Sequence, residues 1–113
     1  MPIAEFKSYE NHGVAVIHGS GRPSLPQDLE ALRTLLSGLI RIKHRQVVLD
    51  LNNITFVGLG WLRILKTLHA GLQSKKGVEM KFYTVDETML FHLRNAQLPA
   101  FDDEAGAVAS FQQ

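Results

Sequence analysis

Apolar and polar positions change period repeatedly along the chain, and the changes predict strands alternating with helices. Loose alternation from Ile3 to Tyr9 and an apolar run from Val14 to His18 predict two strands. The turn residues Glu10-Asn11-His12-Gly13 between them predict an antiparallel hairpin at one edge of a sheet. The third strand is predicted from Gln46 to Leu51, and its apolar run Val47-Val48-Leu49, rich in β-branched residues, is typical of a strand buried on both faces. A fourth strand is predicted from Val78 to Thr84.

Four segments have helical spacing. Ser24 and Gln27 have the spacing of a capping box, and leucines then recur at helical intervals up to about Lys43. The second helix is predicted from about Gly60 to Lys75, with Gly77 after its end and a core stripe of Leu62, Leu65, Leu68, His69 and Leu72. Two short helices follow, Glu87 to Asn95 with Asp86 as its cap and Ala105 to Phe111 after an acidic segment.

This order predicts an α/β fold with a single mixed sheet of four to five strands and about four helices. A chain of 113 residues without linkers, repeats or low-complexity segments is expected to form one domain, residues 1–113. Gly19 to Pro23 is predicted as a loop, and Asn52-Asn53 as a turn after the third strand, because asparagine tolerates left-handed backbone.

The composition of the chain limits the classes of partner and of chemistry that it can have. A net charge of +1 is too small to indicate nucleic acid or an anionic membrane as the main partner. The absence of cysteine excludes disulfides, thiolate nucleophiles and thiolate metal sites. No signal-like N-terminus and no apolar run near the ~20 residues of a spanning helix are present, so we expect a cytoplasmic location.

Two glycine-containing loops stand between a strand and a helix, as in dinucleotide-binding motifs. In the first, Arg63 follows Gly58-Leu59-Gly60 where a third glycine is needed. In the second, Ser24 occupies the equivalent place after Gly19-Ser20-Gly21. Tight connections are therefore the favoured interpretation, with weak anion or nucleotide binding, helped by Arg22, as the alternative.

Candidate catalytic groups do not assemble into a set. The five histidines lack any metal-ligand spacing, with His18 and His69 expected to border the core. Asp50 is the best isolated acid, and a structural role in binding the Asn52-Asn53 turn is favoured over catalysis. We expect no enzyme activity, no cofactor and no metal.

The segment VVLDLNNITFVGLGWL resembles the central signature of STAS domains, V-V-L-D-L-S-x-V-x-F-I-D-S-S-G-L. Val47 to Leu51, Ile54, Phe56 and Val57 match it closely, and the match needs no gap. A strand ending at Gly19 extends the resemblance over nearly the whole chain, together with a segment similar to the family's G-L-x-x-x-F but one residue shorter, Gln97-Leu98-Pro99-Ala100-Phe101. The resemblance implies a STAS-like fold and a role like that of the bacterial anti-sigma factor antagonists.

One departure from the signature concerns regulation. Gly58 and Leu59 occupy the positions of the Asp-Ser pair that carries the family's phosphorylatable serine. The family glycine falls on Trp61, or on Gly60 if the register slips by one. In either register no serine or threonine lies between Phe56 and Trp61, so we expect no phosphorylation at this turn.

The resemblance also implies a partner-binding face. It would include residues of two loops and the exposed side of the second helix: Ser20, Arg22, Ser24, Gly58, Leu59, Gly60, Trp61, Arg63 and Lys66. Leu59 and Trp61 either form a small exposed apolar patch, or Trp61 closes the core beneath the neighbouring loop.

The implied partner is a protein: an anti-sigma factor or serine kinase of the ATPase type, a larger signalling assembly, or the cytoplasmic side of a membrane transporter of which this chain would be a subunit. The chain itself is expected to be a monomer or weak dimer. A leucine at the switch position leaves open whether such a module is locked in its binding-competent state or is a structural subunit that was never switched.

Overall fold

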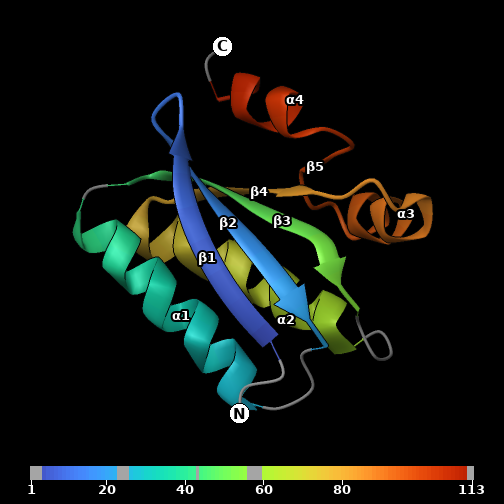
Figure 1. The fold of residues 1–113 in the computed structure, drawn as a ribbon, viewed down its shortest axis with the longest axis horizontal. Coiled ribbons are helices and arrows are strands. Elements are labelled where there is room, and N and C mark those ends of the chain that lie inside the picture. The colour runs from blue at the N-terminus through green and yellow to red at the C-terminus, as the bar shows by residue number, and fades with distance from the viewer. Residues whose placement is uncertain (1–3, 23–25, 43, 56–59, 112–113) are drawn as a thin grey trace.

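A computed structural model describes residues 4–22, 26–42, 44–55 and 60–111. A five-stranded sheet in the order β1-β2-β3-β4-β5 forms its centre (Figure 1). β1 pairs antiparallel with β2, and the remaining neighbours pair in parallel. The strands are β1 (Ala4–Asn11), β2 (Val14–Gly21), β3 (Gln46–Ile54), β4 (Glu79–Tyr83) and β5 (Ala100–Phe101). The mixed sheet and the antiparallel edge pair predicted from the sequence are confirmed.

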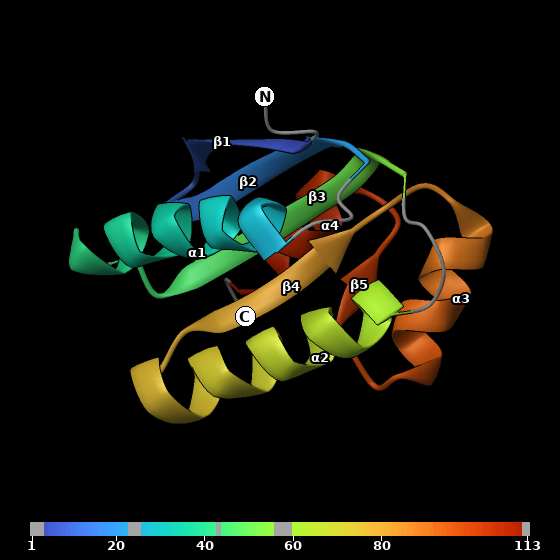
Figure 2. The ribbon, with the colours of Figure 1, turned by 90° about the horizontal axis from the view of Figure 1, so that it is seen from below.

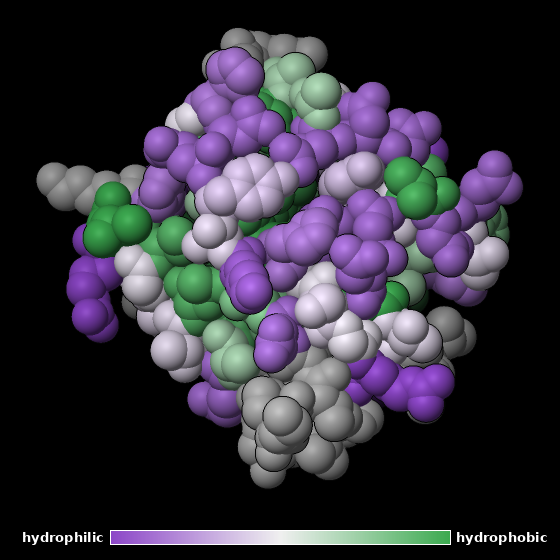
Figure 3. All heavy atoms as spheres, viewed as in Figure 1, coloured by the Kyte–Doolittle hydropathy of each residue, from purple (hydrophilic) through white to green (hydrophobic). Residues whose placement is uncertain are grey.

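Helices cover the two faces of this sheet unequally. α1 (Pro26–Arg41) and α2 (Gly60–Gly71) lie on the same face (Figure 2), where they enclose the larger core cluster with α3 (Glu87–Asn95). The short helix α4 (Glu104–Ala109) packs on the other face through Ala107 and Val108, against Val14, Val16 and Val48. The face that α1 and α2 leave open has a mostly hydrophilic surface with scattered hydrophobic residues (Figure 3).

The two-residue period of the strands explains why both faces have a core. In β2, Ala15 and Ile17 belong to the larger cluster, whereas Val14 and Val16 belong to the smaller one. β3 divides in the same way, and Val47, Val48 and Leu49 are all at most 1% exposed. The run of apolar residues thus forms a central strand with both faces covered, as the sequence indicates.

Two of the predicted loops are strand in the structure, and these predictions were wrong. β2 continues past His18 to Gly21, with an irregular register between His18 and Ser20. Asn52 and Asn53 lie inside β3, which ends at Ile54. The physical reason is cross-strand pairing: Ser20 pairs with Asn53 and Gly21 with Ile54, so each extension satisfies the backbone of the other.

Most of the predicted helix ends lie closer to the observed ones than the predicted ends of β2 and β3 do. Asp86 caps α3 by accepting a hydrogen bond from the Met89 amide at 3.0 Å, as expected. The second helix ends at Gly71 instead of Lys75, and the wider helical turn η1 (Leu72–Lys76) follows. Gly77 closes η1 in the left-handed conformation, φ +64°, and its amide donates to the Leu72 carbonyl.

Candidate functional site

The ends of β2 and β3 lie side by side at the carboxyl edge of the parallel sheet, where ligand and partner sites gather in such folds. The Thr55 amide donates to the Gly21 carbonyl at 2.9 Å, which fixes the chain beyond the last paired residues. α2 starts at Gly60, only a short segment further along. The strand pairing therefore brings Ser20 and Arg22 to the same edge as Thr55, the residue after β3.

A buried carboxylate organises this edge. Asp50 is 3% exposed, and its Oδ1 accepts hydrogen bonds from the Asn52 backbone amide at 2.9 Å and side-chain amide at 2.8 Å. Its Oδ2 lies 2.6 Å from Nδ1 of His18 on the neighbouring strand. The Asn52 side chain accepts a hydrogen bond from the Val85 amide at 2.7 Å, so the network reaches the residues after β4.

The partners of His18 define its tautomer. Nε2 lies 3.1 Å from Nδ2 of Asn53, which is a donor only, so Nε2 accepts. Nδ1 then carries the proton and faces the Asp50 carboxylate. The Asp50 carboxylate thus accepts two hydrogen bonds from Asn52 and contacts the His18 ring, and this arrangement fits the structural role that the sequence favours for this acid.

The outer surface of α2 is basic. Gly60, Arg63 and Lys66 are exposed, and α2 contains no acidic residue. The opposite side packs on the core as predicted, with Leu65 buried and Leu62, Leu68 and Leu72 packed against the larger cluster. His69 lies half-buried beside Phe82, with ring centroids 6.2 Å apart, and burial lowers its pKa.

Trp61 is buried, with 8% exposure, so the interpretation as an exposed aromatic anchor is wrong for its side chain. It lies in the first turn of α2. Ser24, Gly58 and Leu59 lie outside the described residues, and their place in a binding face stays a prediction.

The sequence did not indicate the contact between His18 and Asp50. The two residues are directly paired across β2 and β3, but the register of two strands separated by a helix is not encoded locally. A period of two places each residue on a face of its own strand and leaves the partner open.

In the described ranges, no three histidine, aspartate or glutamate residues lie close enough to hold a metal ion. None of the helices formed by these residues is both long and apolar enough to cross a membrane.

Solved structures of other proteins share this architecture. A crystal structure of an anti-sigma factor antagonist from Mycobacterium paratuberculosis superposes with a TM-score of 0.74 at 16% identity, covering 97% of this chain and 95% of that one. The chain has the fold of an anti-sigma factor antagonist. An uncharacterized protein with a SpoIIAA-like fold from Shewanella loihica gives a TM-score of 0.62 at 18% identity, covering 97% of this chain and 94% of that one. No protein-family model and no curated protein matches the sequence.

Proposed function

We propose that this chain is a non-enzymatic protein-interaction module that binds an anti-sigma factor or serine-kinase-type ATPase, or a signalling assembly containing one. The docking surface comprises Ser20, Arg22, Gly60, Arg63 and Lys66 together with the connection between β3 and α2. The observation that carries the proposal is the near full-length likeness to an anti-sigma factor antagonist.

The positive charge of the docking surface favours a partner that carries an acidic patch. Arg22, Arg63 and Lys66 are exposed cations, and no carboxylate on α2 offsets the latter two. The nearby Asp50 is buried and directed to His18 and Asn52. An acidic patch on the partner would therefore meet uncompensated positive charge, which favours both the rate of encounter and the choice of partner.

The buried network beneath this surface supports a binding role in a second way. Binding surfaces work best when the elements that carry them keep a fixed relative position. The hydrogen bonds of Asp50, Asn52 and Asn53 link β2, β3 and the residues after β4. In this proposal, phosphorylation at the turn does not switch binding on or off, because position 59 is a leucine.

The test is a calorimetric titration with a candidate anti-sigma factor of the serine-kinase type from the same organism. The double variant Arg63→Glu/Lys66→Glu is expected to weaken binding about tenfold or more, which corresponds to ~1.4 kcal/mol. Because both side chains are exposed, the melting temperature should stay close to that of the wild type.

Arg33→Glu is the matched control. Arg33 is an exposed cation on α1, and its ion pair with Glu30 is long, at 3.4 Å. The control variant should bind like the wild type. Equal affinity of the double variant and the wild type, or an equal loss in the control, would show that α2 is not the docking surface.

A further inference from the structure

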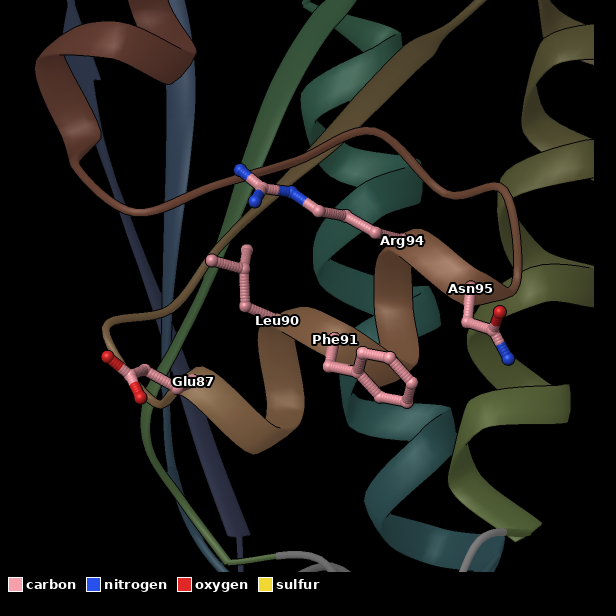
Figure 4. Close-up of a pocket in the computed structure, with 5 residues that line it drawn as sticks. All are labelled: Glu87, Leu90, Phe91, Arg94 and Asn95. Carbon is pink, nitrogen blue, oxygen red and sulfur yellow. The ribbon is translucent and has the colours of Figure 1, made fainter.

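The outer side of α3 carries an exposed aromatic residue that the fold does not use. Phe91 is 65% exposed, and its ring meets the neighbouring His92 edge-on, with centroids 5.6 Å apart. A hollow on this side is lined by Glu87, Leu90, Phe91, Arg94 and Asn95 (Figure 4). Large exposed aromatic side chains of this kind are typical of interface centres.

The order of these residues along α3 is self-complementary. Glu87 and Arg94 are seven residues apart, which is two helical turns, so they lie on one side of the helix. Leu90 and Phe91 occupy the centre between them. Suppose that a second α3 lies antiparallel on the first. Glu87 of each copy then faces Arg94 of the other. In the centre, Leu90 and Phe91 of one copy face Phe91 and Leu90 of the other.

The directions of the side chains fit such a pairing. Figure 4 shows the five side chains in two rows, with Glu87, Leu90 and Arg94 in one and Phe91 and Asn95 in the other, and both rows line the same hollow. Within the described part of the chain, Arg94 makes a long hydrogen bond, 3.4 Å, to the Ala100 carbonyl. A guanidinium has five N–H donors, so most remain available to a carboxylate.

We propose that the outer side of α3 is a twofold interface between two copies of this chain. The occupant is a second copy because the stripe matches itself in both charge and apolar content, as an isologous contact requires. The residues differ from those of the docking surface, so the two proposals succeed or fail separately.

The size of the helix limits the strength of this dimer. A nine-residue helix from each copy covers much less than the ~1,600 Å² of a standard interface. We therefore expect a weak, concentration-dependent dimer with a dissociation constant on the order of 100 μM, which weakens further as salt screens the two ion pairs.

Sedimentation equilibrium of the full chain, up to millimolar concentration, tests the proposal. Glu87→Arg should raise the dissociation constant at least tenfold, because the new guanidinium faces Arg94 of the other copy at both contacts. Arg94→Glu should do the same by setting two pairs of carboxylates together. An equimolar mixture of these two variants should associate again, because both contacts of the mixed dimer join opposite charges. The guanidinium introduced at position 87 faces the carboxylate introduced at position 94, and the unchanged Arg94 of one variant faces the unchanged Glu87 of the other.

Hydrophobic truncation provides a matched comparison. Phe91→Ser should abolish dimerisation, whereas Ile42→Ser, at a position beyond α1 that is 66% exposed, should leave it unchanged. Thermal melting checks that each variant folds. A wild type that stays monomeric at millimolar concentration, a Phe91→Ser variant that dimerises normally, or a charge-variant mixture that does not associate would each overturn the proposal.

Discussion

Gly19 shows how one residue makes the edge of the sheet possible. A β-carbon there would lie 2.5 Å from Cδ1 of Ile54 and 3.0 Å from Cε1 of Phe6, so the side chains from both neighbouring strands occupy its place. Glycine at this position lets Ile54 reach the core although it lies at the end of β3. The irregular register between His18 and Ser20 falls at the same point.

Gly19→Ala is expected to destabilise the fold by about 1–3 kcal/mol, because the new methyl group has no room between Ile54 and Phe6. Chemical denaturation measures the change. Gly38→Ala is the control: its β-carbon would meet nothing within 4 Å, and the site is helical, so we expect a gain of about 0.4–1 kcal/mol. Equal effects of the two substitutions would contradict the packing argument.

At the scale of elements, α4 is attached to the open side of the sheet at both ends. Near its start, Glu104 accepts hydrogen bonds from the Tyr9 hydroxyl and from the Asn11 side chain. Beyond its end, Lys81 donates to the Ser110 hydroxyl at 2.6 Å and lies 4.1 Å from the Phe111 ring centroid. The sequence predicted the helix within one or two residues, but not these contacts, because they join segments 29 to 95 residues apart.

Tyr9 reports on the first of these attachments. Burial of the phenol, followed by its hydrogen bond to the Glu104 carboxylate, raises the pKa of Tyr9 from 10.0 to about 12. Glu104→Gln should lower that pKa while leaving it above 10.0, because burial is the larger cause and persists. Carbon NMR of labelled tyrosine, with Tyr83 as the internal comparison, measures both values.

The sign of the stability effect follows from the same pKa. The pKa of Tyr9 is higher in the folded chain than in the unfolded chain. The stabilisation that the Tyr9 hydroxyl contributes is therefore complete below pH 10 and is lost as the pH rises towards 12. The difference in melting temperature between wild type and Glu104→Gln should therefore shrink across that range. A Tyr9 that titrates at its ordinary value in the wild type would contradict the attachment of α4.

At the scale of the whole molecule, local patterns were sufficient for the architecture. The two-residue period, the apolar run of β3 and the cap at Asp86 predicted the order and type of the longer elements, whereas the two-residue strand β5 was not located. The candidate site was less predictable, because its geometry depends on register. Pairing of His18 with Asp50, and of Ser20 with Asn53, arises only when two distant strands align.

The proposed docking surface of this protein-binding module consists of the carboxyl edge of the sheet and the outer side of α2. The most direct measurement is NMR titration of the isotope-labelled chain with a candidate anti-sigma factor of the serine-kinase type from the same organism. Binding should shift or broaden the amide signals of Ser20, Arg22, Gly60, Arg63 and Lys66, while those of α1 and α4 stay in place. Absence of binding, or changes confined to α1, α3 or α4, would contradict the account.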